Sequence, residues 1–451
     1  MNDFLRLISL QDSNTRVVLA GTTLLGIAAA VVGAFAVLRR RSLVGDAVAH
    51  AALPGVCIAY LIVGERNNVA FMIGALVIGV LAAAFVSFIK SVSRIKEDAA
   101  IGLTIGGFFG VGIVLSRLIQ NQPEGNRAGL DSFIFGKAAS MVVSDVRWII
   151  AVTGVVILVV LLLYKEFKLL CFDRDFTVAS GFPAFALDLL LMGLICICTV
   201  VGLPAVGVVL MVALLVIPGV AARVWTDRLG SMLIIAADFG GLAGFLGTVL
   251  SATLPAPSGS ISRGWPTGPL IVLVAALCFI VSLLVAPKRG LIADALRRSS
   301  LRRRISLQNL LRSAFERTEG PTGTVTRWAL ADLPRSSPIS PSTLRRAMRQ
   351  GLVEGRDNSY ALTPSGLDAA RKVIRAHRLW ELFLIEQADI APDRVDHDAD
   401  QIEHILPPDV IASLEARLAE LGRVSSASTS AVPDSPHALP PAPQRAGAAT
   451  P

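Results

Sequence analysis

The stretch from Arg39 to Gly55 reads RRRSLVGDAVAHAALPG and lies between two long apolar segments. Its three arginines mark the edge of a membrane, because basic residues gather in the loops beside membrane spans. Asp46 and His50 follow at apparent membrane depth, and their spacing of four residues places them on one face of a helix. An ionisable pair at that depth is costly, so it faces a cavity or a partner rather than lipid. Two interpretations stay open: ligands of a first-row divalent metal, or a buried pair that only fixes helix packing.

Composition divides the chain into two parts. The sequence is 53% hydrophobic and 17% charged, which is typical of a membrane protein rather than a single soluble domain. Apolar runs continue to about Gly290, and the remainder is rich in Arg, Asp and Glu. All five cysteines lie in the apolar part without disulfide or zinc-ribbon spacing, which predicts reduced thiols. We expect no cleavable signal peptide, since the first apolar run continues the membrane pattern.

The apolar runs predict about nine membrane spans. They lie near 17–38, 48–63, 68–89, 99–119, 147–164, 184–203, 205–222, 231–253 and 268–286. A re-entrant or interfacial helix near Phe133–Val142 would change the count to eight or ten. Basic residues mark alternate connections: Arg39–Arg41, Lys90 to Lys96, Lys165 to Arg174, Arg223 with Arg228, and Lys288 with Arg289. The positive-inside rule then predicts an outside N-terminus and a cytoplasmic C-terminal part.

The connection from Lys165 to Pro183 predicts a short helix. Asp173 or Asp175 would cap its N-terminus, and Gly181 with Pro183 would end it. A short helix parallel to the membrane is suited to docking a partner ATPase, whereas the alternative is an ordinary surface loop.

The apolar part resembles the permeases of ATP-binding-cassette importers for manganese, zinc and iron, the ABC-3 family. The matching segments run in family order across residues 15–290: RRSLVGDAVAHAALPG at 40–55, RIKEDAAIG at 94–102, DSFIFG at 131–136, FDRDFTVASG at 172–181, VGVVLMVALLVIP at 206–218 and PTGP at 266–269. The resemblance implies an all-α polytopic fold like that of cobalamin importers. It also implies a permease dimer (homo- or heterodimer), a cytoplasmic ATPase, and an extracytoplasmic metal-binding protein in a bacterial inner (plasma) membrane.

The same resemblance assigns roles to residues. Asp46 and His50 would line or gate the metal path. The coupling region would include Asp173, Asp175, Phe176 and Gly181. The chain contains no P-loop motif, so ATP hydrolysis would come from a separate polypeptide, and we predict a transport subunit rather than an enzyme.

Residues 291–305 are basic, with Arg297, Arg298 and Arg302 to Arg304. We interpret them as a juxtamembrane linker that anchors the chain at the membrane surface, with contacts to lipid headgroups or nucleic acid as the alternatives.

Residues 306–366 predict a winged helix-turn-helix. Helices are expected over 307–318, 325–333 and from Pro341, the last with Ser340 as N-cap, followed by a β-hairpin over 351–363 with its turn at 356–359. The third helix would enter a DNA major groove through Ser342, Thr343, Arg345, Arg346 and Arg349. A winged helix used only for protein contact is the alternative.

Residues 367–424 predict a helical metal-binding and dimerisation region. His377 and Glu381 are four residues apart, and Asp400, Glu403 and His404 recur at helical spacing. Histidine with carboxylates is typical of a transition-metal site, and a solvated charged face is the alternative. Residues 425–451, rich in Ala, Pro and Ser, are expected to be disordered.

This part resembles the diphtheria-toxin-repressor family of metal-responsive transcription factors over about 306–420. The matching residues are LTPSG at 362–366, HRLWELFL at 377–384 and IEH at 402–404. The resemblance implies metal ligands at His377, Glu381, Asp400, Glu403 and His404. Asp400 replaces the cysteine of one family branch, which favours manganese, with iron or zinc as alternatives. The family also takes a ligand from its first helix, and residues 307–311 provide no acidic side chain.

Together these observations predict a metal importer permease fused to a cytoplasmic metal sensor. The sensor would repress importer genes, after proteolytic release between Gly290 and Ser306, or inhibit transport directly. A membrane-tethered regulator whose membrane part no longer transports is the alternative from a different functional class.

Overall fold

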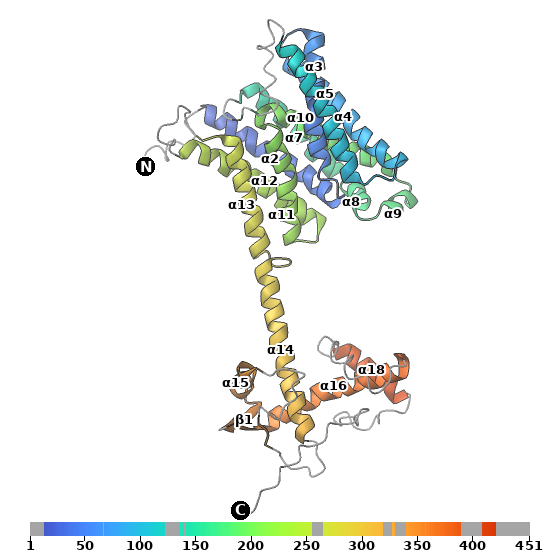
Figure 1. The fold of residues 1–451 in the computed structure, drawn as a ribbon, viewed down its shortest axis with the longest axis vertical. Helices are drawn as coiled ribbons and strands as arrows, with labels where there is room; N and C mark the ends of the chain where they lie inside the picture. Colours follow the sequence, from blue (N-terminus) through green and yellow to red (C-terminus); the bar gives the residue numbers. More distant parts are fainter. Residues whose placement is uncertain are drawn as a thin grey trace, which may run out of the picture. The chain divides into compact units, whose positions relative to one another are not determined.

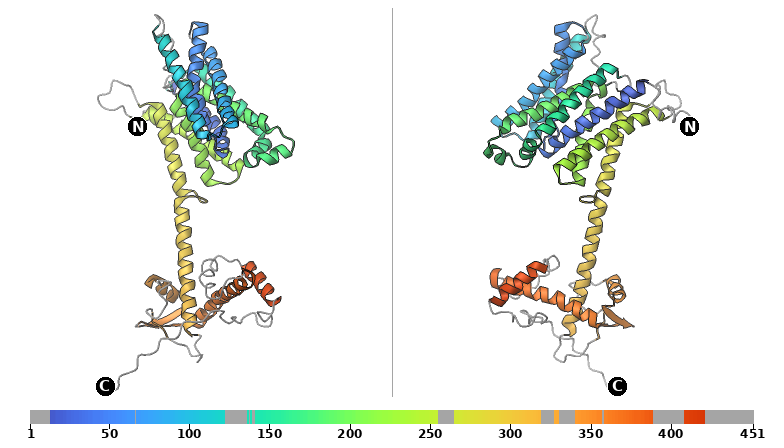
Figure 2. Two further views of the ribbon diagram at one scale, coloured as in Figure 1. Left: turned by 45° about the vertical axis from the view of Figure 1, so that its right-hand side comes forward. Right: turned by 180° about the vertical axis from the view of Figure 1, so that it is seen from behind.

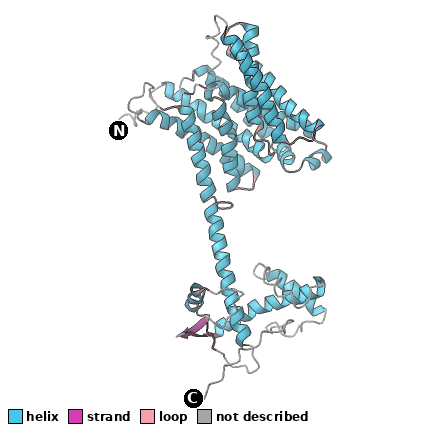
Figure 3. Cartoon of the chain, viewed as in Figure 1, coloured by secondary structure: helices cyan, strands magenta, loops and turns pink. Residues whose placement is uncertain are grey.

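The structure is a computed structural model that describes residues 13–65, 67–121, 136, 138, 141–254, 265–318, 327–329, 340–356, 358–388 and 408–420. The chain divides into two compact units, residues 1–294 and 295–451. Within the described residues the secondary structure is helical apart from one two-stranded sheet and one isolated β-bridge (Figure 3).

The first unit is a bundle of helices (Figure 1). These are α2 (Ser13–Leu38), α3 (Val44–Val63), α4 (Asn68–Val92), α5 (Glu97–Gln120), α7 (Val143–Leu162), α8 (Tyr164–Phe172), α9 (Arg174–Ala179), α10 (Ala184–Val206), α11 (Val208–Trp225), α12 (Leu229–Thr253) and α13 (Thr267–Val285). Among the described residues, nine helices are long and apolar enough to cross a membrane, which confirms the predicted number of spans. Most of the expected re-entrant segment lies outside the described residues.

Helix α2 packs against α7, α10, α11 and α12 (Figure 2). Its contact with α12 depends on glycine. A Cβ atom placed on Gly240 would lie 2.2 Å from the carbonyl oxygen of Gly26, and one on Gly26 would lie 2.2 Å from that of Gly240. Thr22 and Thr248 extend this contact with a 2.9 Å bond between their hydroxyl groups. Small residues therefore let the two backbones approach closely, as in many membrane helix pairs.

Replacing Gly240 with valine should destabilise the first unit, because the new side chain overlaps the backbone of α2. Overpacking of this kind costs about 1–3 kcal/mol or more. The measurement is the thermal unfolding midpoint of the purified protein in detergent. Gly154→Val is the matched control, since a Cβ on Gly154 meets no atom within 4 Å. Equal unfolding midpoints for the two variants would contradict this account of the α2–α12 contact.

The second unit contains the C-terminal part of α14 (Leu291–Thr318), α15 (Pro341–Arg349), β1 (Val353–Arg356), β2 (Ser359–Leu362), α16 (Pro364–Ala388) and α18 (Pro408–Glu420). The strands form an antiparallel hairpin that pairs Val353 with Leu362. Ser340 caps α15 by accepting a bond from the backbone N–H of Ser342. The predicted third helix and hairpin are therefore confirmed. Apolar side chains from α14, α15, the hairpin and α16 share one core, which includes Leu311, Leu344 and Ile374.

Two elements of the second unit differ from the expected secondary structure. Helix α14 runs continuously from Leu291 to Thr318, so it includes residues 291–305, which the sequence assigned to a juxtamembrane linker. This segment contains neither glycine nor proline, so nothing in it interrupts a helix. The predicted helix over 325–333 also fails where the structure describes it. Trp328 instead exchanges two 2.9 Å backbone hydrogen bonds with Tyr360, so pairing to a distant strand overrides the local pattern.

Candidate functional site

The first candidate site is the pair formed by Asp46 and His50 near the start of α3. His50 Nε2 lies 3.4 Å from Asp46 Oδ1, and each side chain is about 30% exposed. The ring of His50 meets the ring of Phe109 on α5 edge-on, with centroids 5.2 Å apart. His50 Nδ1 is buried and has no hydrogen-bond partner. The helical spacing thus brings both side chains together as predicted.

The separation of these two atoms suits a shared divalent ion. A metal about 2.1 Å from an imidazole nitrogen and a carboxylate oxygen leaves those two atoms about 3 Å apart. The pair provides two ligands, and no group of three or more His, Cys, Asp or Glu side chains able to hold a metal occurs among the described residues. A transition metal prefers four or more ligands, so this pair alone does not complete a site.

The second feature is the short helix α9, which the connection between α7 and α10 forms as predicted. Asp173 caps it by accepting a 2.8 Å hydrogen bond from the Phe176 backbone N–H. Gly181 follows with φ of +84°, a left-handed conformation that favours glycine and ends the helix. Asp175 and Phe176 are exposed, with 55% of Phe176 accessible. The helix therefore presents an apolar side chain outward rather than into the bundle.

The third feature is the buried pair of His377 and Glu381 on α16. His377 Nε2 lies 3.2 Å from Glu381 Oε1, and the side chains are 2% and 0% exposed. This geometry also suits a shared metal ion. Asp400, Glu403 and His404 lie outside the described residues, so the structure brings together two of the five predicted ligands.

A side chain that the sequence did not predict to be part of this site lies beside the pair. Arg312 of α14 has its Nη1 3.4 Å from His377 Nδ1, and its Nε donates a 2.8 Å hydrogen bond to Glu316. The first helix of the domain therefore places a guanidinium, rather than an acidic ligand, next to the metal-binding candidates. Arg312 directly follows residues 307–311, and this position in the sequence is the signal that could have revealed it.

The fourth feature is the predicted DNA-binding helix α15. Ser342, Arg345 and Arg349 are exposed, whereas Arg346 is half-buried and Thr343 is only 8% exposed. The buried Thr343 packs into the domain, so the exposed face of α15 carries two of the three arginines.

Comparison with known proteins identifies both parts of the chain. Residues 11–286 match the ABC 3 transport family, and residues 363–424 match the iron dependent repressor, metal binding and dimerisation domain. The manganese transport system membrane protein MntC of Bacillus subtilis is 40% identical over 396 residues, which cover 87% of this chain and 88% of that protein. The zinc transport system membrane protein TroC of Treponema pallidum is 42% identical, covering 68% of this chain and 98% of that protein.

A solved structure agrees with these matches. PsaBC from Streptococcus pneumoniae, in complex with Fab, matches with a TM-score of 0.55 and 31% identity, covering 65% of this chain and 99% of that chain. The nine candidate spans fit a multi-pass membrane protein. The chain therefore belongs to the ABC 3 transport family, and it carries an iron-dependent-repressor domain after the permease region.

Proposed function

We propose that this chain is the permease subunit of an ATP-binding-cassette importer that carries Mn²⁺ into the cytoplasm. The observation that carries the proposal is the Asp46–His50 pair, whose atoms lie 3.4 Å apart inside the membrane unit. An aspartate and an imidazole form a ligand set for first-row divalent metals, and the carboxylate favours manganese over softer ions. The named transport roles of MntC and TroC support a manganese or zinc substrate.

The permease works with partners. Since the described residues of one chain bring together two candidate ligands here, a second permease subunit would bring further ligands to the metal path. A cytoplasmic ATPase would dock on α9, where Asp175 and Phe176 are exposed and where Asp173 and Gly181 fix the two ends of the helix. An extracytoplasmic binding protein would deliver the ion from the opposite side. By the positive-inside rule, the basic connections predict an outside N-terminus and a second unit in the cytoplasm of a bacterial cell.

The second unit would sense the imported ion. His377 and Glu381 would hold the metal together with Asp400, Glu403 and His404. A cation held there by imidazole and carboxylate groups would link α16 to the segment that carries the other three ligands. The metal-loaded domain would then repress importer genes through Ser342, Arg345, Arg346 and Arg349 of α15 or inhibit transport directly. If proteolysis between residues 290 and 306 releases the domain from the membrane, immunoblots of metal-replete cells should show a fragment shorter than the full chain.

The experiment that tests the transported ion is radiolabelled Mn²⁺ uptake by cells that express this chain with its ATPase and binding protein. Unlabelled Mn²⁺, Fe²⁺ and Zn²⁺ are added as competitors at equal concentrations. We expect Mn²⁺ to compete most strongly, because the Asp46 carboxylate is a hard ligand. Stronger competition by Zn²⁺ or Fe²⁺ would assign that ion instead, and uptake of none of the three would contradict the transport proposal.

A further inference from the structure

A buried ion cluster joins the start of α3 to the helices on either side of α9. We name it the Asp188 cluster; it consists of Arg39, Arg41 and Asp188. Arg39 Nη2 lies 2.9 Å from Asp188 Oδ1, and Arg41 Nη1 lies 2.7 Å from Asp188 Oδ2. The three side chains are 11–13% exposed. Each carboxylate oxygen therefore binds its own guanidinium in a setting where charge-assisted hydrogen bonds are strong.

The cluster also reaches α8. Arg39 Nη1 donates a 2.8 Å hydrogen bond to the carbonyl oxygen of Leu170, near the end of α8. Leu170 precedes the α9 cap Asp173 by three residues, and Asp188 follows Gly181 by seven. One arginine thus holds both chain segments that lead into and out of α9.

The two arginines of the cluster also lie next in sequence to α3, the helix that carries Asp46 and His50. Arg39 and Arg41 form the connection between α2 and α3, and α3 begins at Val44, two residues before Asp46. Val44 is buried, so the start of α3 is packed within the bundle. Arg39 and Arg41 are therefore joined through a short backbone connection to the helix that carries Asp46 and His50.

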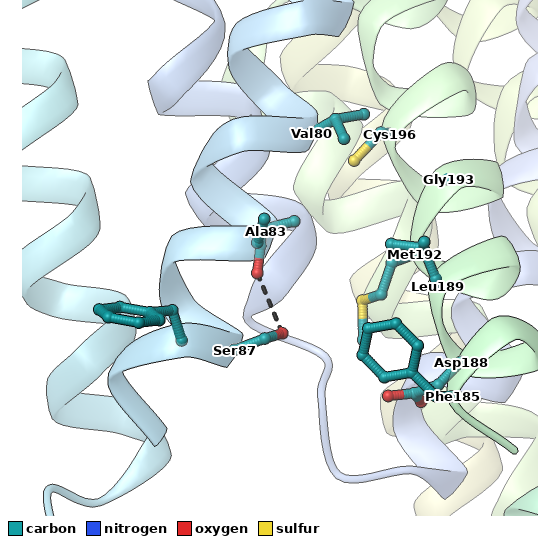
Figure 4. A pocket seen from close by; sticks show the side chains of 11 residues that line it. Val80, Ala83, Ser87, Phe185, Asp188, Leu189, Met192, Gly193 and Cys196 are labelled. Carbon is teal, nitrogen blue, oxygen red and sulfur yellow. Dashed lines mark hydrogen bonds between the residues drawn. The ribbon is translucent and has the colours of Figure 1, made fainter. Parts of the chain in front are cut away.

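The start of α10 is held both by the ion pairs of Asp188 and by apolar packing, since Leu187 shares one buried core with Val44 and Leu170. A cavity of about 440 Å³ lies between α4 and the first turns of α10, and Asp188, Phe185 and Met192 line it (Figure 4). The two helices are thus not closely packed where this cavity lies. The bonds of Asp188 have defined partners and directions, whereas apolar surfaces can slide past one another.

We infer that Asp188 is a positioning residue that transmits movement of α8, α9 and α10 to the start of α3. ATP-driven displacement of α9 would pull on Asp188 and the Leu170 carbonyl, and Arg39 and Arg41 would carry that displacement to Asp46 and His50. This inference rests on the proposed function, because it takes α9 as the ATPase contact. It goes beyond the proposed function by naming the side chains that link the two sites.

The test is the number of Mn²⁺ ions moved per ATP hydrolysed by the assembled transporter in proteoliposomes. We expect Asp188→Asn to lower this ratio at least about tenfold while basal ATP hydrolysis changes by less than about twofold. Asp188→Glu, which keeps the charge, should restore part of the ratio. Arg41→Gln is the second variant if Asp188→Asn fails to assemble, and it should lower the same ratio.

Asp227→Asn is the matched control. Asp227 also binds several basic side chains, with Lys288 Nζ at 3.1 Å and Arg289 Nη2 at 2.9 Å, but it lies between α11 and α12. Its variant should keep the wild-type ratio. An unchanged ratio in Asp188→Asn, or a parallel loss of transport and ATP hydrolysis in assembled complexes, would overturn the inference. Wild-type complexes that hydrolyse ATP but move no metal would instead overturn the proposed function, and the inference with it.

Discussion

Uptake of radiolabelled Mn²⁺ should fall at least about tenfold when Asp46 is replaced by alanine, because a charge-assisted contact is worth about 1.5–3 kcal/mol. The substitution removes the anionic ligand, and His50 alone cannot balance the charge of a divalent ion at membrane depth. The measurement is initial uptake in cells that also express the ATPase and the binding protein. Uptake is expressed per molecule of permease in the membrane fraction.

Two further variants separate ligand loss from a packing defect. Asp46→Asn keeps the size of the side chain but loses its charge, so it should be nearly as inactive as Asp46→Ala. Asp227→Asn removes a carboxylate that lies outside the metal path, so it should keep wild-type uptake. If Asp46→Asn transports at the wild-type rate, the pair serves only helix packing, which is the alternative that the sequence left open.

The second large effect is expected in the second unit. His377→Ala should abolish the response of uptake to metal. Manganese-replete cells that carry the variant should then take up Mn²⁺ as fast as starved cells do. That rate should be about fivefold or more above the rate of manganese-replete wild-type cells. The reason is the burial of this side chain: His377 is 2% exposed and contacts Glu381, so no neighbouring water can readily replace its nitrogen as a ligand. Uptake is measured after preloading with unlabelled Mn²⁺. His437→Ala, in the C-terminal tail, is the matched histidine control and should leave the response intact.

Transcript measurements then distinguish the two modes of action of the second unit. Deleting residues 300–451 removes the sensing domain, so neither repression of importer genes nor direct inhibition of transport can occur. If the domain acts on DNA, importer transcripts should rise in the deletion and in the double variant Arg345→Ala with Arg349→Ala. If it inhibits transport directly, uptake per permease rises while transcripts stay constant. A deletion that changes neither quantity would contradict a sensing role for this domain.

The features that were predicted correctly from the sequence depend on residues close together in the chain, through helical spacing and helix capping. Helical spacing was enough to place Asp46 beside His50 and His377 beside Glu381. The turn chemistry of Asp173 and Gly181 likewise predicted both ends of α9.

The parts that sequence missed depend on distant partners. Asp188 meets Arg39 across 149 residues, and Arg312 meets His377 across 65, separations that no local pattern encodes. Trp328 was placed in a helix because its pairing with Tyr360, 32 positions further along the chain, is equally invisible to periodicity. The roles of Asp400, Glu403 and His404 remain predictions from spacing and family resemblance.

We propose that this chain moves a divalent metal across a membrane at the expense of ATP. The most direct measurement is Mn²⁺ accumulation in proteoliposomes that contain this chain, its ATPase and its binding protein. We expect accumulation of Mn²⁺ with ATP, little with ADP, and loss of ATP-driven accumulation in Asp46→Ala. An assembled complex that binds and hydrolyses ATP but accumulates none of Mn²⁺, Fe²⁺ or Zn²⁺ would contradict it and favour a membrane-tethered regulator.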